Sequence, residues 1–157
     1  MELRLNDARV AQESRTAGIR IILHALRMME YWRAAAGDYN SAMVLLAIVA
    51  VSSEKLTRVD LPPEHRALSE PVGDEALGPC NISSIAAATG FNRETTRRHV
   101  NRLIKEGLLV RSPDGSVRFV EGFVQRQETA DLLALQLETF ARTANELVRL
   151  GVLECRE

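Results

Sequence analysis

Apolar residues recur at three- and four-residue spacing through two long stretches, one near each end of the chain. From Asp7 to Ala36 this spacing is typical of an amphipathic helix, which Gly37-Asp38 is expected to end. Its apolar stripe consists of Ile19, Ile22, Leu23, Leu26 and Met29 and extends towards Arg33. From Gln125 to Leu150 a second long helix is predicted, with an a/d seam of the kind that pairs with another helix. That seam consists of Leu133, Leu137, Phe140, Ala144 and Leu147.

A third stretch, Met43 to Val51, is apolar on every side. Its nine residues are too few to cross a bilayer, which takes about 20 residues. The stretch therefore predicts a buried helix, with Asn40 or Ser41 as its N-cap, and we expect no membrane segment. Residues 1–10 mix charges with isolated apolar side chains instead of forming a continuous apolar leader, so a cytoplasmic protein is expected.

Residues 80–119 contain signals for two short helices followed by two short strands. Ser83 or Ser84 is expected to open an Ala-rich helix that runs to Gly90, and Asn92 has the features of an N-cap for a second helix ending at Gly107. Two Val/Leu/Phe-bearing strands then meet across Pro113-Asp114-Gly115. The predicted fold class is mainly α with a small β-wing: a winged helix-turn-helix flanked by N- and C-terminal dimerisation helices.

The phase of the second helix separates a core side from a polar side. Thr96, Val100, Leu103 and Ile104 lie on one arc. Long cationic or amide side chains dominate the opposite arc, which consists of Glu94, Arg97, Arg98, Asn101, Arg102 and Lys105. Such side chains can bond to base edges in a major groove, although a solvated charged surface has the same pattern. Agreement with the turn and the wing favours double-stranded DNA as the partner. Ser83 and Ser84 are then expected at the DNA backbone, and Arg111 and Arg118 at phosphate or the minor groove.

Charge is unevenly distributed. The segment 80–120 has seven basic and three acidic residues, a balance of +4, whereas the other 13 basic and 18 acidic residues give −5. A basic module on an acidic body is typical of a protein that touches phosphate with one surface only.

The run Arg93-Glu94-Thr95-Thr96-Arg97-Arg98 resembles the start of the recognition helix in the cyclic-AMP receptor protein family. The resemblance covers about forty residues, and it implies that Arg93, Glu94 and Arg98 contact bases and Thr95 a phosphate. The placement of the module between terminal helices resembles the multiple-antibiotic-resistance regulator (MarR) family, and implies dimerisation through those helices.

The remaining segments divide the chain into predicted parts. N-terminal helices occupy 1–57, a Pro-rich linker 58–79, the helix-turn-helix and wing 80–121, and a C-terminal dimerisation helix 122–157. The linker contains Pro62, Pro63, Pro71 and Pro79, with one helical turn expected after Pro63. Three interpretations of the linker are open: a mobile loop, an arm around a partner subunit, or a contact to DNA. The excess of acidic residues in the linker disfavours the contact to DNA.

A small-molecule effector is an open possibility. Met28, Met29, Tyr31 and Trp32 combine flexible thioethers with aromatic rings and could line a ligand pocket, although core or dimer packing explains the same residues. Cys80 and Cys155 lie far apart without metal-like spacing, and His24, His65 and His99 are scattered over different elements. We therefore expect no metal, no cofactor and no enzymatic activity.

These patterns predict a transcriptional regulator that binds a palindromic operator as a homodimer, with the second helix of the module in the major groove. The alternative is a winged helix that serves protein–protein assembly, in which the basic face meets an acidic partner.

Overall fold

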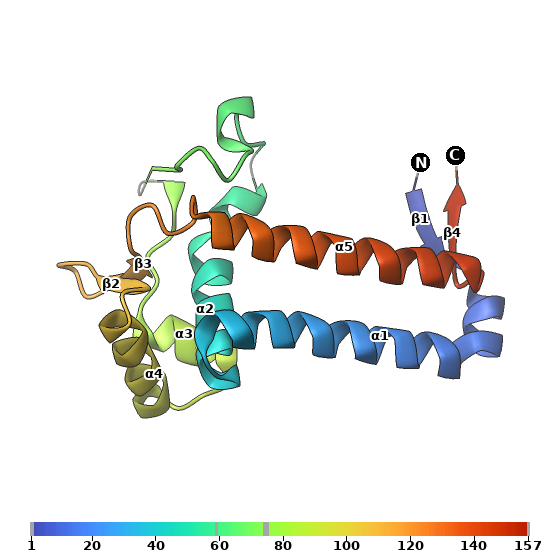
Figure 1. The fold of residues 1–157 in the computed structure, drawn as a ribbon, viewed down its shortest axis with the longest axis horizontal. Helices are drawn as coiled ribbons and strands as arrows, with labels where there is room; N and C mark the ends of the chain where they lie inside the picture. The colour runs from blue at the N-terminus through green and yellow to red at the C-terminus, as the bar shows by residue number, and fades with distance from the viewer. Residues whose placement is uncertain (1, 59, 74–75, 157) are drawn as a thin grey trace. The chain divides into compact units, whose positions relative to one another are not determined.

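The computed structural model describes residues 2–58, 60–73 and 76–156. Two long helices, one after the first strand and one before the last, enclose a series of shorter elements in the sequence (Figure 1). In chain order the elements are β1 (Glu2–Leu5), α1 (Asp7–Ala36), α2 (Tyr39–Ser52), the 3-10 turns η1 (Glu54–Arg58) and η2 (Pro63–His65), α3 (Ile82–Thr89), α4 (Arg93–Lys105), β2 (Leu109–Arg111), β3 (Val117–Phe119), α5 (Gln127–Arg149) and β4 (Leu153–Arg156). The predicted mainly helical class with a small antiparallel hairpin is confirmed.

The chain forms two compact units. The terminal unit combines the chain up to Tyr31 with the chain from Leu132 onward, and the central unit runs from Trp32 to Asp131. Their boundaries fall inside α1 and α5, because each long helix continues past the residues that pack within one unit.

The terminal unit pairs the first and last strands, so that the two ends of the chain lie side by side (Figure 1). β1 and β4 are antiparallel, with Leu3 opposite Cys155 and Leu5 opposite Leu153. This sheet was not predicted from the sequence. Ala17, Leu147 and Val152 form a small apolar cluster beside it.

The helices of the terminal unit contact each other through polar groups. The Tyr31 hydroxyl lies 3.0 Å from Thr139 Oγ1, and His24 Nδ1 lies 3.2 Å from Thr143 Oγ1. Thr139 and Thr143 are buried, one turn apart on α5. By contrast, the predicted apolar stripe of α1 and much of the predicted α5 seam are exposed. The exposed side chains include Ile19, Ile22, Leu23, Leu26, Leu133, Leu137 and Phe140.

The central unit is built around α2. Its buried residues are Ser41, Ala42, Val44, Leu45, Ala47 and Ile48, and α3 and α4 both pack against it. The prediction of a buried helix is confirmed, but its predicted N-cap is wrong. Asp38 caps α2, and its side chain accepts from the Ser41 amide at 2.9 Å. The helical turn expected after Pro63 is present as η2.

Within the part of the chain that the structure describes, no single helix has both the length and the apolarity to cross a membrane, although α1 and α2 meet the criterion as a pair bent by 96°.

Candidate nucleic-acid interface

Local sequence determines where α4 begins. Gly90 ends α3 with a left-handed backbone (φ 74°), a conformation that glycine adopts at little cost. Asn92 then caps α4, since its side-chain oxygen accepts from the Thr95 amide at 2.8 Å. The predicted N-cap at Asn92 is confirmed. The α3 cap is Asn81, which accepts from the Ser84 amide at 3.0 Å, so the prediction that Ser83 or Ser84 opens α3 is wrong.

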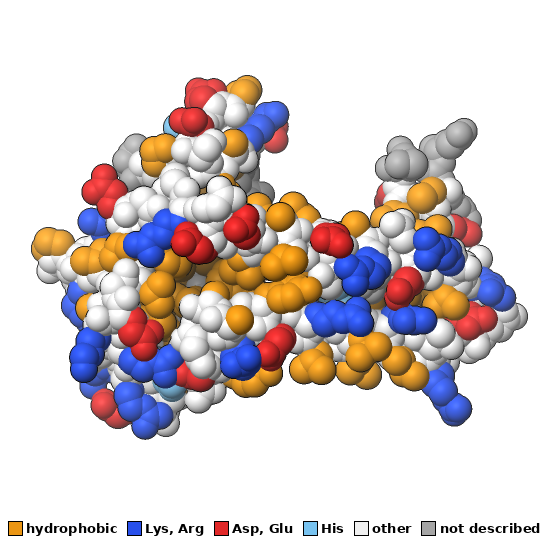
Figure 2. Space-filling model, in the orientation of Figure 1, with side chains coloured by type: hydrophobic (Ala, Val, Ile, Leu, Met, Phe, Trp, Pro, Cys, Tyr) orange, Lys and Arg blue, Asp and Glu red, His pale blue; other side chains and the backbone are white. Residues whose placement is uncertain are grey.

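α4 separates a packed side from an exposed side, as its phase predicts. Thr96, Val100 and Leu103 are fully buried (0% exposed) against the central unit. The other side is exposed, and Lys and Arg side chains gather over it at the lower left of Figure 2. We call this side the polar face of α4, formed by the exposed residues Arg93, Glu94, Arg97, Arg98, Asn101 and Lys105.

Arg102 differs from its predicted role. Its side chain is half-buried and forms an ion pair with Asp38 at the start of α2. Arg102 Nη2 also donates to the Ala36 carbonyl at 2.9 Å, and Nε lies 3.3 Å from the Glu106 carboxylate. The ion pair and the bond to Ala36 connect α4 to the chain around α2, so the prediction of Arg102 as a member of the exposed basic set is corrected.

The hairpin lies next to the polar face. Arg111 is exposed at the end of β2, and its Nη2 donates to Asn101 Oδ1 of α4 at 3.2 Å. Arg118 is exposed in the middle of β3. Gly115 (φ 84°) allows the turn between the strands. Of the remaining predicted residues, Ser83 is exposed and Ser84 is half-buried in the first turn of α3, and Thr95 is half-buried in the first turn of α4.

Two contacts orient residues of the polar face. Arg97 Nη1 donates to the Glu94 carboxylate at 2.7 Å, one turn away on the same helix. The bond from Arg111 fixes the Asn101 oxygen as an acceptor. The Asn101 amide nitrogen therefore remains a donor towards solvent. The described residues provide no partner for the guanidinium of Arg98.

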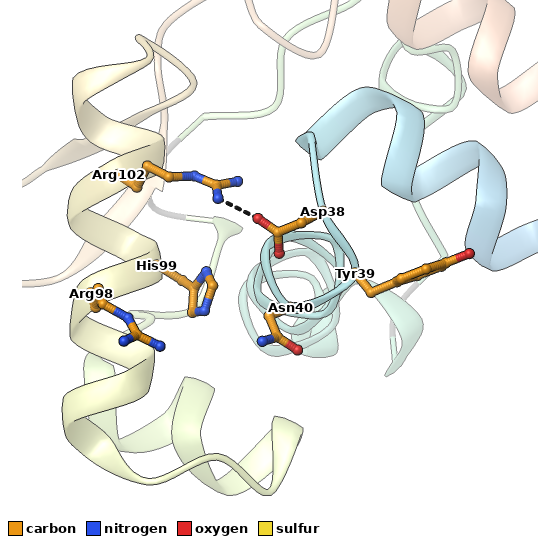
Figure 3. A pocket seen from close by; sticks show the side chains of 6 residues that line it. All are labelled: Asp38, Tyr39, Asn40, Arg98, His99 and Arg102. Atoms are coloured by element: carbon orange, nitrogen blue, oxygen red, sulfur yellow. Dashed lines mark ion pairs between the residues drawn. The ribbon is translucent and has the colours of Figure 1, made fainter.

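An open cavity of about 610 Å³ lies beside this face, between the start of α2 and α4 (Figure 3). It is lined by Asp38, Tyr39, Asn40, Arg98, His99 and Arg102. Sequence reasoning did not find it. The polar residues at positions 38–40 and the basic residues at 98–102 were both visible in the sequence, but only the packing of α2 on α4 brings them together.

Hydrogen bonds and burial shift two pKa values at this cavity. Burial raises the pKa of Asp38, but hydrogen bonds from Ser41 and Arg102 outweigh it, so the net pKa is lowered. His99 is only 8% exposed, and its Nδ1 lies 3.0 Å from Ser41 Oγ. Burial lowers the pKa of His99; the Asp38 carboxylate opposes this shift, while Arg102 and Arg98 add to it.

The residues predicted to line an effector pocket lie elsewhere. Met28, Met29, Tyr31 and Trp32 are half-buried, and none of them lines this cavity. Tyr31 takes part in the contact with Thr139, which agrees with the alternative interpretation of helix packing. Within the described residues, no group of three or more His, Cys, Asp or Glu side chains is arranged to hold a metal ion.

Comparisons with protein-family models, with curated proteins and with solved structures found no match to this chain.

Proposed function

We propose that this protein is a sequence-specific DNA-binding regulator of the winged helix-turn-helix type, which binds a palindromic site as a homodimer with α4 in the major groove. The observation that supports this most directly is the polar face of α4. Its long side chains are exposed, while Thr96, Val100 and Leu103 on the opposite side are fully buried. Asn101 is a side chain of the type that bonds bidentately to adenine.

The elements around α4 support the same proposal. α3, the Gly90 turn and α4 are followed by a two-stranded hairpin. The segment before α3 joins the edge of that hairpin, because the Val117 amide donates to the Cys80 carbonyl at 2.6 Å. Arg111 and Arg118 are exposed on the hairpin, where they would face phosphate or the minor groove while α4 contacts bases.

Exposed apolar side chains in the terminal unit support the homodimer. Ile22 on α1 is 67% exposed, and on α5 Leu137 is 59% and Phe140 61% exposed. Figure 2 shows hydrophobic side chains gathered along the outer edge of α1. Soluble proteins rarely leave such contiguous patches uncovered. Because α1 and α5 meet through Thr, His and Tyr within one chain, we infer that their apolar faces pack against the same faces of a second copy.

Selection from a random duplex library tests the proposal. The purified full-length chain is incubated with double-stranded oligonucleotides, the retained fraction is amplified and sequenced, and the affinity for the enriched site is measured at several salt concentrations. We expect a palindromic motif and a steep loss of affinity with salt. The variant Asn101→Ala is selected in parallel and is expected to lose its base preference at one position of each half-site.

The alternative outcome is equally specific. If no motif is enriched, and binding to any duplex disappears at about 0.15 M salt as non-specific binding does, the DNA proposal fails. The basic surface would then serve an acidic protein partner.

A further inference from the structure

We propose that the cavity between the start of α2 and α4 receives a backbone phosphate of the duplex bound by α4. This inference rests on the proposed function and adds a phosphate-binding site that belongs neither to α3 nor to the hairpin. The site is defined by Asn40, Arg98 and His99, three of the residues that line the cavity (Figure 3).

The charge of the cavity suits an oxyanion. Arg98 and Arg102 contribute two guanidinium groups, and Asp38 contributes one carboxylate, which leaves a balance of +1 with His99 neutral. Arg102 and Asp38 neutralise each other in their ion pair. The Arg98 guanidinium is therefore the charge available to a ligand. It belongs both to the cavity and to the polar face of α4.

The start of α2 adds a second favourable field. The first amides of a helix lack intrahelical acceptors, and the helix dipole places partial positive charge there. Asp38 satisfies the Ser41 amide, and no acidic residue follows in the first turn of α2. Asn40 is exposed in that turn, where the positive end of the helix dipole favours an anion and the Asp38 carboxylate, neutralised by Arg102, opposes it only weakly.

The ring of His99 is a separate observation that points to a ligand. It projects from α4 towards the start of α2, between Arg98 and Arg102 (Figure 3). Ser41 Oγ donates its only hydroxyl hydrogen to Asp38 Oδ2 at 3.2 Å, so His99 Nδ1 must donate to Ser41. His99 Nε2 is buried without a hydrogen-bond partner among the described residues. An oxyanion in the cavity would favour the protonated ring, in which both nitrogens are donors.

A duplex is the occupant that fits the position of the cavity. Arg98 links the cavity to the face proposed to enter the groove, and phosphates line both edges of a major groove. A phosphate held here would fix the register of α4 without reading sequence.

The test uses Asn40→Asp in the full-length chain, with Lys55→Gln as the matched control. Both variants lower the charge by one, and they lie at or just beyond opposite ends of α2 in the same unit. An acidic residue in the first turn stabilises a helix, so Asn40→Asp is not expected to impair folding. Its affinity should fall about fivefold to tenfold on the selected site and equally on scrambled duplex, and the salt slope should drop by about one. Lys55→Gln should bind both duplexes as wild type does.

Each outcome has a distinct meaning. A wild-type chain that binds no duplex would overturn the proposed function and this site with it. Wild-type binding combined with unchanged affinity and salt slope for Asn40→Asp would overturn the site alone. A loss confined to the selected sequence would also overturn it, because Asn40 would then contact a base. A further arm titrates inorganic phosphate while the His99 ring is followed by NMR. A ring response together with an unchanged DNA salt slope would assign the cavity to a free anion instead.

Discussion

Arg98 and Arg102 lie one turn apart on α4 and were predicted to have the same role, yet their contacts differ: Arg102 forms an ion pair with Asp38, whereas Arg98 has no partner among the described residues. We expect Arg102→Ala to lower the free energy of unfolding and to leave the sequence preference intact. Arg98→Ala should leave the free energy of unfolding unchanged and should weaken binding to DNA. The comparison is well matched, because both variants remove one guanidinium from the same helix.

The magnitude for Arg102→Ala follows from its contacts. The bond to the buried Ala36 carbonyl is charge-assisted, and its loss costs about 1 to 2 kcal/mol. The Arg102 and Asp38 side chains are 38% and 35% exposed, so solvent screening limits their ion pair to about 0.2 to 1 kcal/mol. Together these terms give about 2 kcal/mol. Arg98 has no described partner, and its removal should change stability by less than about 0.5 kcal/mol.

Urea unfolding followed by circular dichroism measures the first effect, and titration of the selected duplex measures the second. Arg98→Ala should lose about 1 to 3 kcal/mol on the selected site and a similar amount on scrambled DNA, because Arg98 is proposed to hold a backbone phosphate. A double-mutant cycle with Asp38→Asn, which retains an N-cap side chain, isolates the ion pair. The reasoning is refuted if Arg102→Ala keeps the wild-type urea midpoint and loses sequence preference, since Arg102 would then contact bases as first predicted.

Three further predictions concern other parts of the chain. Burial raises the pKa of the Cys80 thiol to about 11, so one thiol, Cys155, should react rapidly with a thiol reagent at pH 8; two rapid equivalents would contradict this. Burial lowers the pKa of His99 below 6.5, so its neutral form contributes stability that is present above pH 6.5 and lost as pH falls through the folded pKa. The free energy of unfolding of His99→Gln, measured with urea, should therefore fall less than that of wild type between pH 7 and 5. Equal losses in the two proteins would contradict this prediction. Phe140→Lys should convert the proposed dimer to a monomer in light scattering, whereas Asn145→Lys, which adds the same charge on the same helix, should not.

The long helices were predictable because their signals are local and repeated. α1 has the predicted bounds, Asp7–Ala36, and α5 differs from its prediction by two residues at the start and one at the end. Both misplaced N-caps have one physical origin. Ser41 and Ser84 were taken as possible caps, but each donates its amide to the true cap three residues earlier. A cluster of Asn, Asp and Ser therefore defines a helix start only to within one turn.

Tertiary contacts explain what the sequence did not predict. The β1–β4 sheet joins segments about 150 residues apart, and its only local signal is the short charged–apolar alternation Glu2-Leu3-Arg4-Leu5. Helix phase placed Arg102 on the polar arc of α4, and the phase contains no information about Asp38 at the start of α2. His99 is the same case, since its buried bond to Ser41 depends on α2.

The two units make the two halves of the proposed function separable. The exposed apolar side chains proposed to form the dimer, such as Ile22, Leu137 and Phe140, lie in the terminal unit, whereas the polar face of α4 lies in the central unit. A monomeric Phe140→Lys variant therefore retains the complete reading surface. We expect this variant to bind a single half-site as wild type does and to lose the added affinity for the full palindrome, because that gain comes from a second linked contact. Titration of half-site and full-site duplexes measures both. If Phe140→Lys is monomeric yet binds the full palindrome with undiminished affinity, the palindrome is not read by two copies and the dimeric mechanism fails.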